Sequence, residues 1–216
     1  MAPIIFFMLK LKERPRAFYY IVLLTAFLFV MNVGKLFYHQ ARPYWLSPNV
    51  HAYSCSTQYG NPSGHSLFGM GATLTIWLDL NQTVLSGGIS ASSIWAKCYI
   101  RAVLFASAVT FGLLVGYSRI ILGAHAWNQL ALGWQLGVWL ALTLHFIFRE
   151  SILRNVKGLL EVRDTNYRRV LSLWLVIMLA TLVAMVANAL ATEPRIVDDP
   201  SWAEAIATKC GPEKAQ

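Results

Sequence analysis

Three basic side chains stand in otherwise apolar or turn-forming sequence, and together they suggest a site for an anion. Lys35 and Arg42 are seven residues apart, so on one helix they would share a face about 10 Å apart, with Pro43 ending that helix. Arg119 lies at the end of a later apolar stretch. Cations that converge without a matching carboxylate predict anion binding. The alternative, for each residue alone, is an interfacial anchor.

The tetrapeptide Pro62-Ser63-Gly64-His65 opens another apolar stretch after a loop rich in Gly, Ser, Pro and Asn. Ser63 is placed to cap a helix that begins here, where free amide N–H groups and the positive end of the helix dipole meet. Such a helix start binds phosphate readily. The alternative for the tetrapeptide alone is a simple helix cap.

His125 follows Arg119 by six residues and opens a further apolar stretch. A histidine in this setting is costly unless it has a partner or a task. Gln129 lies one helical turn later, where its amide oxygen could accept a hydrogen bond from the imidazole and fix its tautomer. The alternative for His125 alone is a structural histidine with a satisfied ring, which is the role we predict for His39, His51 and His145.

The elements that position these residues are long apolar stretches. The chain has 216 residues, of which 56% are hydrophobic and 13% charged, and this composition excludes a disordered chain and a soluble nucleic-acid-binding protein. A bilayer core of about 30 Å needs roughly 20 apolar residues in a helix. We therefore predict an all-α, polytopic membrane bundle of about five transmembrane helices, at residues 17–38, 64–80, 99–117, 125–148 and 170–192.

Basic residues fall unevenly on the two sides of such a bundle if consecutive stretches cross in alternate directions. One side holds twelve and the other six, and the positive-inside rule places the richer side in the cytosol. We expect a cytosolic stub at residues 1–16, a membrane domain at 17–192 and a lumenal or external tail at 193–216. The twelve are Lys10, Lys12, Arg14, Arg16, Lys97, Arg101, Arg149, Arg154, Lys157, Arg163, Arg168 and Arg169.

Cysteines and small residues carry weaker signals. Cys55, Cys98 and Cys210 show neither a disulfide framework nor metal-ligand spacing, so they are predicted to be three ordinary thiols. Gly133 and Gly137 form a small-residue pair that can pack a helix closely, either within the chain or between chains. Partner membrane proteins and a homo-oligomer therefore both remain open.

The polar motifs combine into a known signature. Lys35 with six residues to Arg42-Pro43, then Pro62-Ser63-Gly64-His65, then Ser118-Arg119 with five residues to His125, resemble the three motifs of the type 2 phosphatidic acid phosphatase and vanadium haloperoxidase superfamily. Ten residue types match in order, each on the same predicted side of the membrane. The resemblance covers about residues 17–148 and implies a shortened core of that fold.

The resemblance also implies roles for these residues. His125 would be the nucleophile that forms a phosphohistidine, and His65 the general acid that protonates the leaving oxygen. Neither a metal nor a cofactor is expected, because a cluster of cations takes the metal's place. The phosphoryl oxygens would be held by Lys35, Arg42, Ser63, Gly64 and Arg119.

One position departs from the common family pattern. Where an Asp usually orients the nucleophilic histidine, this chain has Gln129, as glucose-6-phosphatase-like members do. The sequences Arg42-Pro43-Tyr44-Trp45 and Cys55-Ser56-Thr57 also resemble that branch. Asp79 cannot supply the missing carboxylate, because 14 residues of helix carry it about 21 Å from His65.

These features favour a membrane phosphatase with a lumenal or external site, in the endoplasmic reticulum by resemblance to that branch. A phosphorylated small molecule is the expected partner, with a sugar phosphate favoured and a lipid phosphate next, among membrane lipids and without nucleic acid. Four aromatic residues would line the mouth, where they could stack on a sugar or lie at the headgroups. The alternative is an inactive family-derived subunit, which Gln129 favours. The aromatic residues are Tyr44, Trp45, Tyr53 and Tyr59.

The predicted orientation has a chemical test. Asn81-Gln82-Thr83 is a formal acceptor for an N-linked glycan, but it lies at the cytosolic end of the second stretch, out of reach of the glycosylating enzyme. We expect the protein expressed in eukaryotic cells to keep its mass after glycosidase treatment. A loss of mass would reverse the whole orientation.

Overall fold

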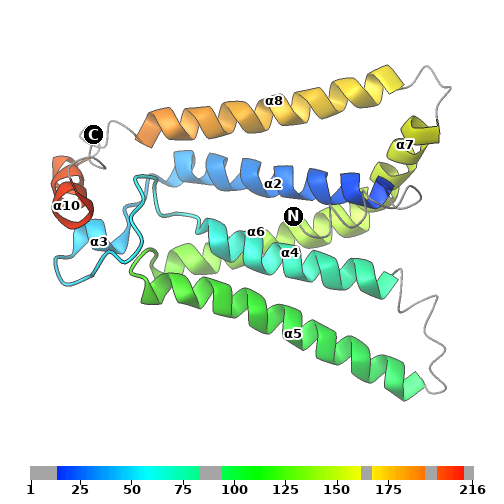
Figure 1. Ribbon diagram of the computed structural model, residues 1–216, viewed down its shortest axis with the longest axis horizontal. Helices are drawn as coiled ribbons and strands as arrows, with labels where there is room; N and C mark the ends of the chain where they lie inside the picture. Colours follow the sequence, from blue (N-terminus) through cyan, green and yellow to red (C-terminus); the bar gives the residue numbers. More distant parts are fainter. Residues whose placement is uncertain (1–13, 83–93, 162–166, 193–198, 212–216) are drawn as a thin grey trace.

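A computed structural model describes residues 14–82, 94–161, 167–192 and 199–211. In these ranges every regular element is a helix, which confirms the all-α prediction. The long helices run side by side, with short helices at either end of the bundle (Figure 1). The long helices are α2 (Arg14–Tyr38), α4 (Gly64–Leu80), α5 (Ile94–Ile121), α6 (Trp127–Thr143) and α8 (Tyr167–Thr192).

The five predicted stretches all fall on helical segments, and the second, 64–80, has the bounds of α4, whereas the other four differ at one or both ends. In the described part of the chain, three segments are long and apolar enough to cross a membrane, namely Pro15–Leu46, Lys97–Ile121 and Trp127–Gly158. Helix α4 has 17 residues, and α8 has 26, with a shorter apolar segment at Met178–Ala187. The described part of the bundle therefore has the helices of an integral membrane protein, and three of its segments are both long and apolar enough for a full span.

The fourth stretch begins and ends later than predicted. Helix α6 begins at Trp127, so His125 precedes the helix instead of opening it. The chain then passes through a π-helical turn, η3 (Leu144–Phe148), and continues as α7 (Arg149–Glu161). Arg149, predicted to lie in the cytosolic connection after this stretch, is therefore the first residue of a continuing helix.

Close contact between α4 and α6 depends on the two glycines of the predicted pair. A Cβ atom at Gly133 would lie 2.6 Å from the carbonyl oxygen of Ser63, and one at Gly137 would lie 2.5 Å from that of Leu67. Real Cβ atoms do not approach backbone oxygens so closely, so only glycine allows this packing. The small-residue pair is thus used within the chain.

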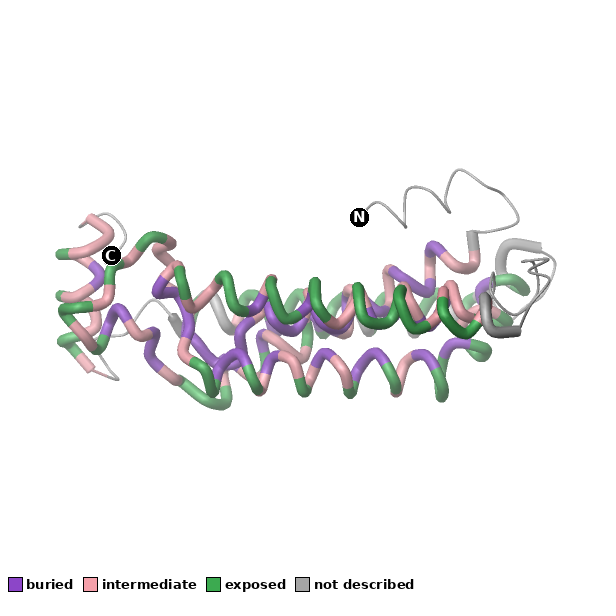
Figure 2. Tube along the Cα trace, turned by 90° about the horizontal axis from the view of Figure 1, so that it is seen from below, coloured by how far each residue is buried: buried purple, intermediate pink, exposed green. Residues whose placement is uncertain are grey.

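Each long helix has a side that packs into the bundle and a side that is exposed. Buried and exposed segments alternate along the long helices (Figure 2), and the buried core joins α2, α4 and α6 through Phe27, Leu67 and Leu140. The exposed side chains of α5 and α8 are largely apolar, as expected for surfaces that face lipid instead of water. Among them are Phe111, Leu114, Leu175 and Val183.

A buried carboxylate joins three helices at the end of the bundle where α2 begins. Asp79 Oδ2 lies 2.6 Å from Arg16 Nη2, and Asp79 Oδ1 lies 2.6 Å from Arg149 Nη2. The hydroxyl of Tyr20 donates a third hydrogen bond to Oδ2, at 3.0 Å. The sequence assigned Arg16 and Arg149 to the topology signal alone, and this was incomplete because both also neutralise Asp79 inside the bundle.

The opposite end of the bundle carries two short helices, α3 (Pro43–Leu46) and α10 (Pro200–Cys210). They lie beside each other in Figure 1, and a disulfide joins Cys55 to Cys210, with a Cα–Cα distance of 5.9 Å. The prediction of three ordinary thiols is therefore wrong for this pair, whose 155-residue separation hides it from spacing rules. Cys98 is a free, exposed thiol.

The predicted aromatic mouth is also largely wrong. Tyr44, Trp45 and Tyr59 are buried in a cluster with Ile206 of α10, whereas Tyr53 is 73% exposed. The three buried rings therefore fasten α10 to α3 and the following loop, and of the four predicted residues only Tyr53 is exposed.

Removing the carboxylate of Asp79 should destabilise the bundle, because the buried guanidinium of Arg149 and the half-buried one of Arg16 would lose the carboxylate that they share. We expect Asp79→Ala to lower the free energy of unfolding by about 3–5 kcal/mol, as chemical denaturation in detergent would measure. Glu150, which pairs with Arg149 but is 69% exposed, provides the control. Glu150→Gln should change stability by less than about 1 kcal/mol, and equal effects of the two variants would contradict the role of Asp79.

Candidate active site

A cavity of about 450 Å³ opens at the α10 end of the bundle, where α2 and α5 end and α4 begins. Six of the eight predicted site residues line it, which are Lys35, Arg42, Gly64, His65, Arg119 and His125. Ser63 and Gln129 lie behind these residues. Met31 and Phe68 add apolar wall, and Ser54, Ser56 and Gln58 add polar wall.

The three cations reach the cavity from different elements. Lys35 and Arg119 lie in the last turns of α2 and α5, where the negative end of the helix dipole favours a cation. Arg42 instead precedes α3 in extended conformation. The predicted shared helix face is therefore wrong, because α2 ends at Tyr38 and the next residue, His39, has a φ of 43° that turns the chain out of the helix.

Pro43 accordingly has the opposite effect to the one predicted. It occupies the first turn of α3, and Arg42 is the residue before it, with φ −83° and ψ 153°. Proline suits a first helical turn because its missing N–H would have no partner there, and it holds the preceding residue extended. Pro43 thus begins a helix and fixes the backbone that carries the Arg42 side chain into the cavity.

Each cation donates a hydrogen bond to one short segment, residues 54–58, which we call the strap. Lys35 Nζ donates to Gln58 Oε1 at 2.5 Å, and Arg119 Nη2 donates to Ser54 Oγ at 3.2 Å. Arg42 donates through Nη2 to Ser56 Oγ at 3.1 Å and through Nε to the Gln58 carbonyl at 2.7 Å. The strap thus supplies neutral oxygens to all three cations.

The ring of His125 is held so that one nitrogen faces Arg42. His125 Nδ1 lies 2.9 Å from the carbonyl oxygen of Gly60 and 3.2 Å from Gln129 Oε1. Because both partners only accept hydrogen bonds, Nδ1 must carry the proton. Nε2 is then unprotonated, and it accepts from Arg42 Nη1 at 3.3 Å. A neutral imidazole with its lone pair beside the cation cluster can act as a nucleophile.

Gln129 lies in the first turn of α6 and is 1% exposed. Its Oε1 also accepts from the backbone N–H of Ala126 at 3.2 Å, and its Nε2 donates to the carbonyl of Ala41 at 2.8 Å. These bonds fix which end of the amide is oxygen, since only the oxygen can serve His125 and Ala126. The amide therefore orients the ring, without the charge of a carboxylate.

The start of α4 brings two predicted residues to the cavity and withholds a third. Gly64 and His65 line the cavity, and the His65 side chain is exposed. Ser63 is fully buried, and its hydroxyl accepts hydrogen bonds from the N–H and the hydroxyl of Ser66. The Ser63 hydroxyl thus caps α4, while Gly64 presents the helix start to the cavity.

A family model for the PAP2 superfamily matches residues 16–153, which contain all eight predicted site residues. The chain belongs to the PAP2 superfamily. No curated protein and no solved structure matches it. The matched range of this PAP2 protein includes the strap, whereas helix α10 and its Cys210 lie beyond it.

Membership of the PAP2 superfamily suggests phosphatase activity towards phosphoric monoesters. The cavity suits such a reaction in general chemical terms. Phosphoryl transfer depends mainly on positioning and on neutralising negative charge, with little covalent work for the protein. Three cations around a half-enclosed cavity provide this charge, and the two cavity histidines provide groups that can accept or donate a proton.

Sequence reasoning missed the strap and Gly60. Ser54, Ser56 and Gln58 lie in a loop whose composition indicated only a turn, so no local pattern marked them as partners of the cations. Gly60 is buried and carries the carbonyl that holds His125. A Cβ atom at Gly60 would lie 2.6 Å from the amide of Gln129, so this glycine leaves room for the residue that orients the ring.

Adding a methyl group at Gly60 should disturb this packing, since Gln129 is buried and cannot move aside. We expect Gly60→Ala to lower the free energy of unfolding by about 1–3 kcal/mol, measured by chemical denaturation in detergent. Gly158 in α7 is the matched control, because a methyl group added there would meet no neighbour within 4 Å. Gly158→Ala should raise the free energy of unfolding by about 0.5–1 kcal/mol. An unchanged free energy of unfolding in Gly60→Ala would show that the amide of Gln129 leaves room for the added methyl group.

Proposed function

We propose that this PAP2 protein is an integral membrane phosphatase that hydrolyses phosphomonoesters through a phosphohistidine at His125. The observation that carries the proposal is that one cavity is lined by three cations and by a buried histidine whose unprotonated Nε2 accepts from Arg42. Lys35, Arg42 and Arg119 would hold the phosphoryl oxygens, together with the amide of Gly64 at the start of α4. No metal is required, since the cations supply the positive charge.

In the first step, His125 Nε2 attacks phosphorus as the ester P–O bond breaks. The leaving oxygen takes a proton from His65, which therefore begins the step as an imidazolium. His125 Nδ1 keeps its proton, and the growing positive charge on the ring is stabilised by Gly60 and Gln129 through their oxygens. In the second step, His65 accepts a proton from water, the water oxygen attacks phosphorus, and the P–N bond breaks to release phosphate.

We propose a lumenal or external position for the site, with the amino terminus in the cytosol and the endoplasmic reticulum as the membrane. The disulfide between Cys55 and Cys210 supports this orientation, because disulfides persist in oxidising compartments and this one lies at the site's end of the bundle. The charge count also supports it. With Arg16 and Arg149 set aside as partners of Asp79, ten basic residues remain on the cytosolic side against six.

For the substrate we propose a sugar phosphate such as glucose 6-phosphate, with a lipid phosphate as the next candidate. Strap hydroxyl and amide groups in the cavity wall suit a sugar's hydroxyl groups, while Met31 and Phe68 would contact an apolar part of the ligand. Gln129 and the motif Arg42-Pro43-Tyr44-Trp45 support the glucose-6-phosphatase branch. Because Tyr44 and Trp45 are buried, these two residues would support the surrounding fold and would not stack on the sugar.

A second candidate function is an inactive PAP2-derived subunit that binds lipid or partner helices. The observation that favours it is the neutral amide of Gln129 at the position where the common pattern has a carboxylate, because an amide stabilises an imidazolium less than a negative charge does. The proposed enzyme and this subunit differ in one measurable property, turnover that depends on His125.

The test is hydrolysis by purified protein in detergent, with a chelator present, of glucose 6-phosphate and separately of phosphatidate. We expect vanadate-sensitive release of phosphate that His125→Ala reduces to background, because the nucleophile is lost. Arg119→Ala should lower kcat/KM about 10- to 150-fold, the loss of one hydrogen bond to a charged group. Trapping of acid-labile phosphate on His125 would identify the intermediate.

His51→Ala is the matched control, since this exposed histidine contacts Tyr53 outside the cavity. It should retain activity. Turnover that survives in His125→Ala would contradict the mechanism, and failure of the wild-type chain on every phosphoester tried would favour the inactive subunit.

A further inference from the structure

We propose that the strap is a positioning element whose neutral oxygens aim the three cations at the bound phosphate, and that the disulfide to α10 holds the strap in place. This inference rests on the proposed function, since it concerns the same phosphate site. With respect to the phosphate, the strap residues are positioning residues, because they act on it through Lys35, Arg42 and Arg119.

The first observation is the one-to-one correspondence between cations and strap side chains. Gln58, Ser56 and Ser54 each accept a hydrogen bond from a different cation, at 2.5, 3.1 and 3.2 Å. Within five residues the strap thus reaches cations carried by α2, the α2–α3 connection and α5. No other segment in the described ranges has a side chain bonded to each of the three.

The second observation is that these acceptors carry no charge. Lys35 and Arg42 are each only 4% exposed, so they need oxygen partners in place of the water that they lose on burial. A carboxylate would meet that need but would also cancel the charge that an incoming phosphate requires. An amide or hydroxyl oxygen fixes the direction of the N–H groups and leaves their positive charge in the cavity.

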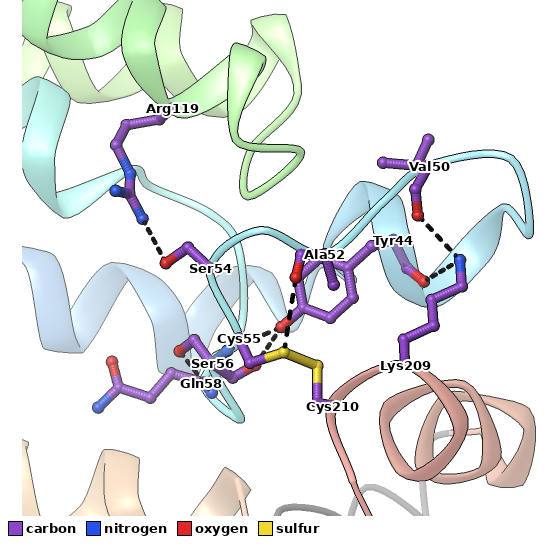
Figure 3. Close-up of a disulfide and its surroundings, with 10 residues drawn as sticks. All are labelled: Tyr44, Val50, Ala52, Ser54, Cys55, Ser56, Gln58, Arg119, Lys209 and Cys210. Atoms are coloured by element: carbon purple, nitrogen blue, oxygen red, sulfur yellow. Dashed lines mark hydrogen bonds between the residues drawn. A yellow bond between two sulfur atoms is a disulfide. The ribbon is translucent and has the colours of Figure 1, made fainter.

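The third observation is the way in which the strap itself is fixed. The buried hydroxyl of Tyr44 donates to the carbonyl of Ser56 at 2.6 Å and accepts from the Ser56 N–H at 2.8 Å. Cys55, between Ser54 and Ser56, is joined to Cys210 at the end of α10 (Figure 3). The middle of the strap is therefore tied to two elements outside the cavity.

Helix α10 is in turn fixed to the same region, so it can serve as an anchor. Asp199 caps its first turn by accepting from the N–H of Ser201, and Trp202 packs against Trp45 with 5.7 Å between ring centroids. Near the disulfide, Lys209 Nζ donates to three backbone carbonyls that precede the strap, those of Tyr44, Ser47 and Val50. Figure 3 shows the bonds to Tyr44 and Val50.

A positioning role predicts a specific pattern of effects on anion binding. Gln58→Glu keeps an acceptor for Lys35 but neutralises its charge, so a structural role would tolerate it and the proposed role would not. Cys210→Ser leaves the strap sequence intact but frees it from α10. Cys98→Ser removes the free, exposed thiol of the described residues and is the matched control for cysteine replacement.

The experiment measures the dissociation constant of orthovanadate by calorimetry on the purified full chain, with the thermal midpoint of each variant recorded alongside. We expect Gln58→Glu to weaken vanadate binding at least about tenfold with a midpoint close to that of the wild type. Cys210→Ser should weaken it by about threefold or more, because a loosened strap must be ordered on binding. Cys98→Ser should bind like the wild type.

Two outcomes overturn the proposal. Wild-type affinity in Gln58→Glu would show that the strap does not direct the cations towards the anion, and absence of vanadate binding by the wild-type chain would show that the cavity is not an anion site. Because Gln58→Glu leaves the disulfide intact, it decides the question even if Cys210→Ser does not fold. Vanadate binding that follows the expected pattern in a chain without turnover would support the strap and refute the phosphatase.

Discussion

A positive charge buried among apolar helices must find oxygen, and the kind of oxygen decides what that charge can do. At one end of the bundle, Arg16 and Arg149 share the carboxylate of Asp79, which neutralises their charge, and these ion pairs hold three helices together. At the other end, Lys35 and Arg119 donate to neutral side chains, and their charge stays in the cavity. The two ends of the bundle thus differ in whether the oxygen that accepts from the cations is charged or neutral.

Close backbone packing links the bundle to the geometry of the two cavity histidines. Gly133 lets α6 approach the carbonyl of Ser63, and the N–H of Ser63 donates to the carbonyl of Gln129 at 3.0 Å. The start of α4, which carries His65, is therefore bonded directly to the start of α6, which follows His125. Backbone contacts therefore set the relative position of the two chain segments that carry these histidines.

The sequence could predict features that are local. Apolar length predicted where the long helices lie, and motif spacing predicted six residues that line one cavity. It could not predict pairings between distant residues, such as Asp79 with Arg149 or Cys55 with Cys210, because nothing near either partner identifies the other. Hydropathy also failed for Tyr44 and Trp45, whose amphipathic rings suit a membrane interface as well as the buried cluster that they form under α10.

The disulfide has a consequence for the way in which the protein matures. Cys55 precedes the second long helix, whereas Cys210 ends α10, 155 residues later. Synthesis runs from the amino terminus, so the first thiol must wait until the last long helix has been inserted and α10 has been delivered to the same side. The strap can therefore be joined to α10 only after α8 and α10 have both been placed.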